Sequence, residues 1–237
     1  KKLKKINPLK IYDLQNSSRT KFYKNILFPK AKFDTWSSSE TTLPKNIAKD
    51  IFDKNPVLDR FDFQLKNSGL KTTNTLKPNF NWACSNIEEI KKIFDLKKYI
   101  ILFPFCSTHL THKKWPYYNE LIDLIKKKFD ENFKIVVAPG PSEINETKNI
   151  NALSILDNDK ALNISQLSSL IKDSLFVIAN DTGPAHMAAH LGAKGLTLFG
   201  KHTTAYKVSI ERENFKAIQV SDLKKLSAQK VLENILI

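Results

Sequence analysis

The sequence lacks any long apolar run. No stretch approaches the roughly 20 consecutive apolar residues that a membrane-spanning helix requires. No signal peptide is visible, because the lysine-rich first residues lead into a short mixed segment rather than an apolar core. The chain has 41% hydrophobic and 26% charged residues, a composition typical of globular proteins. We therefore expect a cytoplasmic protein.

Arginine is scarce, although the chain is strongly basic. The formal net charge is +14, yet only Arg19, Arg60 and Arg212 are arginines. Specific recognition of phosphates and base edges favours the planar, bidentate guanidinium group. The lysines are scattered and form no basic stripe with interleaved aromatic residues. This pattern argues against a specific nucleic-acid partner. It leaves open a lysine-rich solvated surface or attraction to an anionic membrane or glycolipid.

Cysteine and methionine are also rare. Cys84 and Cys106 lie far apart without metal-ligand spacing, so we expect two free thiols and no metal centre. The chain begins with Lys1, and Met187 is its only methionine. We therefore expect the sequence to be a fragment of a longer protein.

The region from residue 91 to residue 200 alternates between strand and helix patterns. Continuous apolar runs predict buried strands, and apolar residues at helical spacing predict helices. The predicted strands are 99–103, 133–138, 175–179 and 195–199; the predicted helices are 115–129, 162–172 and 184–191, with a terminal helix at 227–235. Strands that alternate with helices of these lengths are typical of a parallel sheet covered on both faces.

Residues 1–80 are less regular. The sequence predicts a short strand at 11–14, a polar loop at 15–19, helices at 44–52 and 55–69, and an interdomain linker at 71–84. This part has too few strands for a complete α/β domain. We therefore predict two domains, residues 1–85 and 86–237, of which the N-terminal one is incomplete.

The most informative segment runs from Asn180 to Pro184, where a predicted strand passes directly into a predicted helix. Such a turn points backbone N–H groups and the positive end of the helix dipole at one spot, which suits a phosphate. Gly183 lets an anion approach the backbone closely, and Thr182 offers a hydroxyl donor. An ordinary N-cap at Asp181 or Thr182, without any ligand, explains this turn equally well.

Two further predicted strands end in polar loops. Ser107, Thr108 and Lys113 follow the strand at 99–103, where the lysine is either solvated or placed to neutralise a diphosphate. Glu143 follows the strand at 133–138, where it either accepts hydrogen bonds from a ribose or interacts with a helix dipole. Since ligands of parallel sheets bind at the carboxyl ends of strands, the three loops together predict one nucleotide site.

These segments resemble glycosyltransferase family 9, the heptosyltransferases of lipopolysaccharide core synthesis. The resemblance rests on residues 107–108, 113–116, 140–143, 180–183 with His186, and 198–200. Residues 12–19 are also similar to the family's Asp-Leu-Gln-Gly-Ser segment, with Asn16 in place of the glycine. The resemblance implies a GT-B architecture, in which two Rossmann-like domains face each other across a cleft.

The resemblance also implies an inverting, metal-independent transfer of a heptose without a cofactor. The donor is an ADP-heptose held by the C-terminal domain, and the acceptor is an anionic glycolipid at the inner membrane. By this resemblance, Thr182 and Gly183 bind the diphosphate, assisted by Ser107, Thr108 and Lys113. Glu143 contacts the ribose, and Asp181 contacts the sugar. His186 lies in the pocket behind the phosphates.

This sequence departs from the family pattern in two places. The family's glycine-rich loop with its catalytic aspartate has no counterpart, and its expected position lies upstream of Lys1, so no catalytic base is assigned. Gly200 is followed by Lys201, His202 and Thr203, where the family more often has proline. This second departure affects the loop expected to contact the donor sugar.

Several assignments have alternatives. Ser17, Ser18 and Arg19 either contact the anionic acceptor or form an ordinary polar loop. His186 and His190 have the spacing of a zinc-binding pair, but no glutamate lies between them, and we favour a pocket role for His186 without metal. The chain is therefore expected to be a glycosyltransferase, or else a catalytically incomplete module that binds a nucleotide sugar or a glycolipid.

Overall fold

The computed structural model describes residues 8–29, 35–129 and 133–236, and the chain divides into two compact units. The first unit comprises the residues up to Pro78 together with Lys207–Ser209, and the second comprises Asn79–Tyr206 and the residues from Ile210 onward. The division falls within the segment 71–84 that the sequence predicts as a linker. Residues 79–84 belong to the second unit, where the Phe80 N–H donates to the carbonyl of His190 (3.0 Å).

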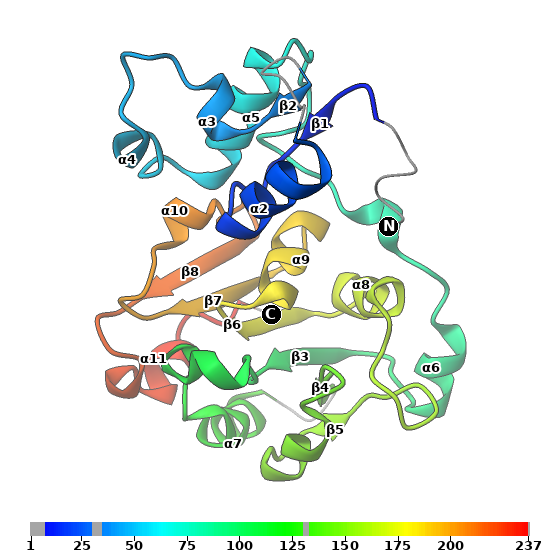
Figure 1. Ribbon diagram of the computed structural model, residues 1–237. Helices are drawn as coiled ribbons and strands as arrows, with labels where there is room; N and C mark the ends of the chain where they lie inside the picture. The colour runs from blue at the N-terminus through cyan, green and yellow to red at the C-terminus, as the bar shows by residue number, and fades with distance from the viewer. Residues whose placement is uncertain (1–7, 30–34, 130–132, 237) are drawn as a thin grey trace. The chain divides into compact units, whose positions relative to one another are not determined.

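The second unit is built on a six-stranded sheet in which all neighbouring strands are parallel (Figure 1). The strands lie in the order β5-β4-β3-β6-β7-β8. Their bounds are β3 (Tyr99–Phe103), β4 (Lys134–Val137), β5 (Leu153–Ser154), β6 (Phe176–Asn180), β7 (Gly195–Phe199) and β8 (Phe215–Gln219). The α/β fold with a parallel sheet that the sequence predicts is therefore confirmed.

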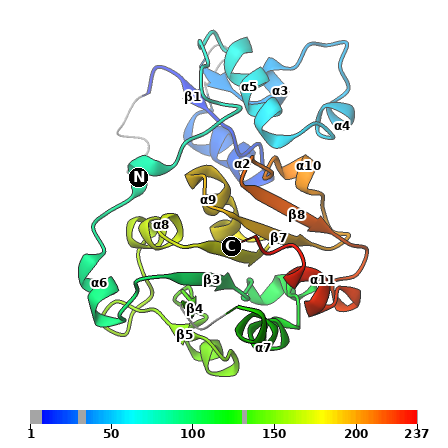
Figure 2. The ribbon, with the colours of Figure 1, turned by 180° about the vertical axis from the view of Figure 1, so that it is seen from behind.

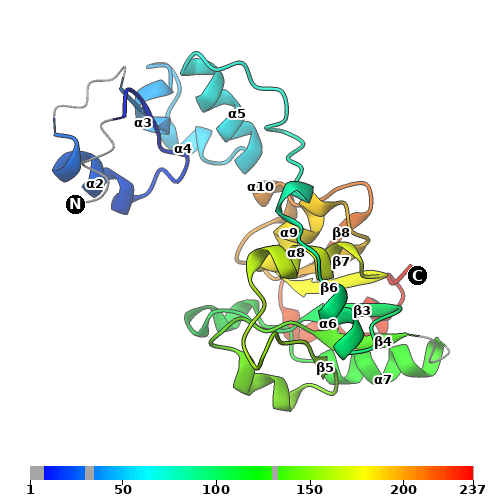
Figure 3. The same cartoon turned by 90° about the vertical axis from the view of Figure 1, so that its right-hand side faces the viewer.

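Helices cover both faces of this sheet (Figures 2 and 3). On one face, α7 (Tyr118–Lys128) and α11 (Ala228–Leu232) pack on a core that includes Ile100, Leu102 and Ile178. Because successive strand residues point to opposite faces, the intervening residues face α8 (Ile164–Lys172) and α9 (Gly183–Leu191). All residues of β3, β6 and β7 are buried, as expected for central parallel strands.

The boundaries of the helices follow from local capping. The side chain of Asn163 accepts the Gln166 N–H (2.9 Å) at the start of α8, and the Gln166 side chain accepts the Asn163 N–H (3.0 Å). The helix α9 ends at Gly192, whose φ of +75° suits glycine. The remaining elements of this part are α6 (Glu88–Ile93), α10 (Ala205–Val208) and four short 3₁₀ helices, η1 (Asn81–Ala83), η2 (Thr108–Lys113), η3 (Ile144–Asn149) and η4 (Leu223–Lys225).

The first unit has few strands among its described residues. Its two short strands, β1 (Ile11–Tyr12) and β2 (Trp36–Ser37), pair in parallel. Its helices are α2 (Ser18–Leu27), α3 (Ser39–Thr42), α4 (Lys49–Phe52) and α5 (Val57–Asn67). No helix in the described part of the chain is long and apolar enough to span a bilayer.

Two predictions for the first unit are wrong. The predicted helix at 44–52 is helical only at Lys49–Phe52, because an earlier turn closes at Pro44, whose carbonyl accepts the Ile47 N–H (3.0 Å). The predicted loop at 15–19 is non-helical only as far as Ser17, because Ser17 and Thr20 form a reciprocal capping box that starts α2 at Ser18. By contrast, the helix predicted at 55–69 is confirmed as α5.

Candidate functional site

The strand order creates a switch point between β3 and β6. From β3 the chain passes outward through β4 to β5, and it then returns to β6 on the other side of β3 before continuing to β7 and β8. The loops that leave β3 and β6 therefore run in opposite directions and leave a crevice at the carboxyl edge of the sheet. Ligands of open α/β sheets bind in such crevices.

A buried amide holds the loops around this crevice together. Asn180, the last residue of β6, is fully buried, and its Oδ1 accepts hydrogen bonds from the Trp115 N–H (3.2 Å) and the Tyr118 hydroxyl (3.3 Å). Its Nδ2 donates to the carbonyl of Pro104 (2.9 Å). One side chain thus links the end of β6 to the loop after β3 and to the start of α7. This link fixes the geometry of the crevice.

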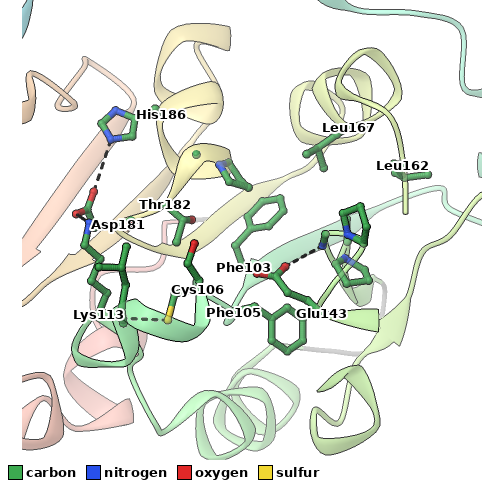
Figure 4. A pocket seen from close by; sticks show the side chains of 18 residues that line it. Phe103, Phe105, Cys106, Lys113, Glu143, Leu162, Leu167, Asp181, Thr182 and His186 are labelled. Carbon is green, nitrogen blue, oxygen red and sulfur yellow. Dashed lines mark hydrogen bonds and ion pairs between the residues drawn. The ribbon is translucent and has the colours of Figure 1, made fainter. Parts of the chain in front are cut away.

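The crevice contains a cavity of about 530 Å³ at the ends of β3, β4 and β6 (Figure 4). The three loops singled out in the sequence all contribute to its lining. The predicted residues that line it are Ser107, Lys113, Glu143, Asp181, Thr182, Gly183 and His186. The side chain of Thr108, the remaining donor-binding candidate, lies outside the described part of the structure.

Asp181 is the centre of a charged cluster at one end of the cavity (Figure 4). Lys113 Nζ lies 2.7 Å from Asp181 Oδ2, and His186 Nε2 lies 3.6 Å from Oδ1. A third side chain, His202, places Nε2 2.9 Å from Oδ2. The Asp181 side chain is only 5% exposed, so these neighbours, rather than water, stabilise its charge.

The surroundings of Asp181 also set its protonation. Burial by itself raises the pKa of this carboxyl group, but the contacts from His186, Lys113 and His202 outweigh burial. The net result is a pKa well below the ordinary value of 3.8. Asp181 is therefore ionised at neutral pH and keeps Lys113 at the edge of the cavity.

The amino end of α9 faces the same cavity. Thr182 is the N-cap of this helix, yet its side chain makes no capping hydrogen bond, and the hydroxyl instead lies 3.3 Å from the Asn180 carbonyl. The side chain of Asp181 is likewise occupied by Lys113 and His202. A Cβ atom at Gly183 would meet no heavy atom within 4 Å, so the backbone there is open to close approach. Thr182 is therefore the N-cap residue, as the alternative of an ordinary N-cap expects, but neither side chain caps the helix with a hydrogen bond.

The other end of the cavity has a different chemistry. Glu143 Oε2 accepts the Gly140 N–H (2.8 Å), which folds the turn after β4 and leaves the second carboxylate oxygen facing the cavity region. A Cβ atom at Gly140 would lie 3.1 Å from Glu143 Oε2, so a side chain there would crowd the carboxylate that closes this turn. Leu162 and Leu167 form an apolar wall beside it, at the far side of the cavity from Asp181 (Figure 4). The cavity is thus polar and charged at one end and partly apolar at the other.

The histidine pair on α9 does not form a metal site. His190 Nδ1 lies 3.4 Å from a guanidinium nitrogen of Arg212, whose positive charge disfavours a bound cation. Burial, together with the charges of Arg212 and His186, lowers the pKa of His190 to about 4. Within the described residues, no group of three or more histidine, cysteine, aspartate or glutamate side chains is placed to hold a metal ion.

Cys84 and Cys106 are free thiols, as predicted. Cys106 lines the cavity, but its thiol donates to the Leu110 carbonyl (3.3 Å), and burial raises its pKa. The thiol is therefore protonated at neutral pH.

The acceptor-side candidates lie in the first unit. Ser17 and Ser18 line a separate polar cavity of about 240 Å³, together with Asp13 and Glu40. Arg19 is not among the residues that line it. The hydroxyl of Ser39, another lining residue, is buried and has no hydrogen-bond partner among the described residues. This cavity therefore offers hydroxyl and carboxylate groups that suit a small polar ligand.

Comparison with known families assigns the chain to a glycosyltransferase family. The model of glycosyltransferase family 9 (heptosyltransferase) matches residues 34–235, which is most of the chain. The chain belongs to glycosyltransferase family 9. The match includes every residue that lines the large cavity, so the site lies within the family's own sequence pattern.

Solved structures share the fold of this family 9 chain. Escherichia coli heptosyltransferase WaaC with ADP has a TM-score of 0.65 at 18% identity, and the match covers 96% of this chain and 72% of WaaC. WaaC with ADP-2-deoxy-2-fluoro heptose gives 0.55 at 19% identity, covering 75% and 54%. E. coli ADP-heptose lps heptosyltransferase II gives 0.54 at 18% identity, covering 79% and 62%. This likeness confirms the GT-B heptosyltransferase fold.

The matches also differ from this chain in extent. The matched region spans about half to three quarters of the length of these heptosyltransferases, 54% in the first and 72% in the second. No curated protein sequence matches the chain. The chain therefore has the family and the fold of the heptosyltransferases.

Proposed function

We propose that this chain holds an ADP-activated heptose in the large cavity and serves its transfer, with inversion at the anomeric carbon, to an anionic lipopolysaccharide core acceptor. The observation that carries this proposal is the ion pair of Lys113 and Asp181 beside the uncapped amino end of α9, within one cavity. A cation, the positive end of a helix dipole and an accessible glycine together suit a diphosphate.

The diphosphate would lie against Thr182 and Gly183, with Lys113 at its side. During transfer, negative charge develops on the leaving diphosphate, and groups already in place stabilise it without reorganisation. Lys113 is such a group because Asp181 holds its ammonium at the edge of the cavity. In this proposal the charge stabilisation comes from the lysine and the helix dipole, so no metal ion is required.

The two ends of the cavity would divide the donor between them. Glu143 and the wall of Leu162 and Leu167 suit an adenosine, whose ribose offers hydroxyl donors and whose base is flat and apolar. Asp181 and His186, at the opposite end, would face the heptose hydroxyls (Figure 4). The separation of a charged end from an apolar end therefore supports an elongated nucleotide sugar.

The choice of ADP and heptose draws support from the family and from its solved members. The titles of two E. coli WaaC structures name ADP and ADP-2-deoxy-2-fluoro heptose as bound molecules. Those ligands belong to WaaC. They bear on this chain through the shared family and the shared fold.

For the acceptor, we propose the cavity at Ser17 and Ser18, where the lining lysines Lys21 and Lys24, with Arg19 next to Ser18 in the sequence, would attract an anionic group. The +14 net charge of the chain would favour anionic glycolipid and the cytoplasmic surface of the inner membrane. Vesicle binding that falls steeply with salt, and that requires anionic lipid, would support this part of the proposal.

A nucleotide-sugar-binding module without transfer activity is the second candidate. The observation that favours it is that every residue lining the large cavity belongs to the second unit, so donor binding does not depend on residues of the first. An assay that follows ADP release from ADP-heptose, with and without acceptor glycolipid, separates the two candidates. Acceptor-dependent release supports transfer, whereas binding without release supports the module.

Titration of the purified chain with ADP tests donor binding directly. We expect saturable binding that Lys113→Ala weakens by about 1.5–3 kcal/mol, the usual cost of losing a hydrogen bond to a charged group. The control is Lys216→Ala, an exposed lysine on β8 that does not line the cavity. Absence of ADP binding, or equal binding by Lys113→Ala and the wild-type chain, would contradict the proposed function.

A further inference from the structure

His202, in the loop that follows β7, contacts the charged end of the cavity through Asp181. It is not among the residues that line the cavity, yet its Nε2 lies 2.9 Å from Asp181 Oδ2. The same oxygen receives Lys113 Nζ at 2.7 Å. Two side chains from different loops therefore hold one oxygen of a carboxylate that faces the donor.

The His202 ring is itself held firmly. It stacks on Phe199, with ring centroids 6.1 Å apart and planes at 18°, and it meets the His112 ring edge-on at 5.3 Å. Gln219 braces the backbone of this loop by donating to the carbonyl of Gly200 (2.7 Å). Only 12% of the His202 side chain is exposed. Because packing fixes the ring, its Nε2 presents a donor in a fixed direction.

The two oxygens of Asp181 consequently have different surroundings. Oδ2 has two partners within hydrogen-bond distance, whereas the contact found for Oδ1 among the described residues is His186 at 3.6 Å, beyond the usual range of about 2.7–3.2 Å for an N–H···O bond. A carboxylate oxygen can accept more than one hydrogen bond. Oδ1 therefore keeps the capacity to accept a hydrogen bond from a ligand hydroxyl.

We infer that His202 is a positioning residue for the donor sugar: together with Lys113 it anchors Asp181 Oδ2, so that Oδ1 is oriented to accept a hydrogen bond from a sugar hydroxyl. This inference rests on the proposed function. A single lysine on a flexible stem fixes the position of the carboxylate, but a second donor at a different angle is needed to fix its rotation. His202 supplies this second donor.

A positioning role of His202 predicts different effects on the binding of ADP and of ADP-heptose. ADP has no heptose hydroxyls, so the orientation of Asp181 affects ADP binding little and ADP-heptose binding strongly. Loss of His202 should therefore reduce the preference for ADP-heptose over ADP and should leave Lys113 and the amino end of α9 in place.

Calorimetric titration of four chains with ADP and with ADP-heptose tests this inference. His202→Phe keeps a ring against Phe199 and removes the donor, while His202→Gln keeps an N–H donor of similar reach. We expect His202→Phe to weaken ADP-heptose binding by about tenfold and ADP binding by less than about threefold, as for the loss of one hydrogen bond to a charged group. His202→Gln should restore most of the lost affinity, and the control Lys216→Ala, an exposed lysine on β8 outside the cavity, should resemble the wild-type chain.

A spectroscopic readout needs neither a ligand nor a His202 variant. Long-range ¹H–¹⁵N spectra of the ligand-free wild-type chain should show a downfield, slowly exchanging His202 Nε2–H, and this signal should disappear in Asp181→Ala. A signal that is unaffected by Asp181→Ala overturns the inference.

The titrations also separate the possible failures. If His202→Phe binds ADP-heptose as tightly as the wild-type chain, or if it weakens both ligands equally, the positioning role is wrong while the donor site stands. If the wild-type chain binds neither ADP nor ADP-heptose, the proposed function fails and the role of His202 toward the sugar fails with it.

Discussion

Asp181 is a nearly buried carboxylate surrounded by basic side chains. Lys113, His186 and His202 approach it from different loops, and none of these contacts is local in sequence except that of His186. A buried charge is costly unless such partners replace water. The cluster therefore stabilises the folded state and, at the same time, holds charged groups at the edge of the large cavity.

This cluster predicts a specific dependence of stability on pH. The pKa of Asp181 is lower in the folded chain than its ordinary value of 3.8, so the ionised carboxylate stabilises the fold above that value and loses this effect as the pH falls below it. We expect Asp181→Ala to lower the free energy of unfolding by about 1–3 kcal/mol at pH 7. The difference from the wild-type chain should shrink steadily below about pH 4.

Urea unfolding at pH 7, 5, 4 and 3 measures this difference. The control variant is Asp123→Ala, which changes an exposed aspartate on α7. A difference between Asp181→Ala and the wild-type chain that stays constant from pH 7 to pH 3, or that grows toward low pH, would show that Asp181 is not stabilised in its ionised form.

At the scale of elements, two glycines serve different purposes. A Cβ atom at Gly195, the first residue of β7, would lie 2.4 Å from the Val177 carbonyl oxygen and 2.9 Å from the Phe215 ring. At Gly183, the first residue of α9, the same atom would meet nothing within 4 Å. Gly195 is thus required for close approach of neighbouring strands, whereas Gly183 leaves space for a ligand.

Matched alanine substitutions distinguish these purposes. Gly195→Ala should destabilise the fold by about 1–3 kcal/mol, because the new methyl group collides with a backbone that cannot move freely. Gly183→Ala should leave the melting temperature close to that of the wild-type chain and weaken ADP binding. Thermal melts and ADP titrations of both variants measure the two effects, and a loss of stability without a loss of ADP affinity in Gly183→Ala would refute the ligand role.

The elements of the second unit could largely be predicted from the sequence, because central parallel strands are continuous apolar runs. The predictions at 99–103 and 195–199 match β3 and β7 residue for residue. Other elements lack such a signal. The edge strand β8 is only partly buried, and α2 buries none of its side chains, so neither shows an apolar pattern that would predict it.

The sequence predicts the site residues of each loop separately, but it does not predict the contacts between loops. Lys113, Glu143 and Asp181 each follow the carboxyl end of a predicted strand, and this shared position places them at one edge of a parallel sheet. His202 also follows a predicted strand, β7, but its contact with Asp181 depends on β7 lying next to β6. The strand order, which the local sequence does not contain, was needed to find it.

At the scale of the whole molecule, the second unit contains a complete cavity whose two ends suit the two halves of a nucleotide sugar. The switch point between β3 and β6 creates the cavity, Asn180 holds its loops together, and the amino end of α9 faces it. Membership of glycosyltransferase family 9 is consistent with this arrangement. We therefore expect a bound nucleotide sugar to place its diphosphate at Lys113 and Gly183 and its adenosine toward Glu143.

A crystal structure of the chain with ADP tests this orientation most directly. We expect the diphosphate oxygens within hydrogen-bond distance of the Gly183 N–H and Lys113 Nζ, and the ribose beside Glu143. ADP bound with its diphosphate at the Glu143 end, or bound outside this cavity, would contradict the account.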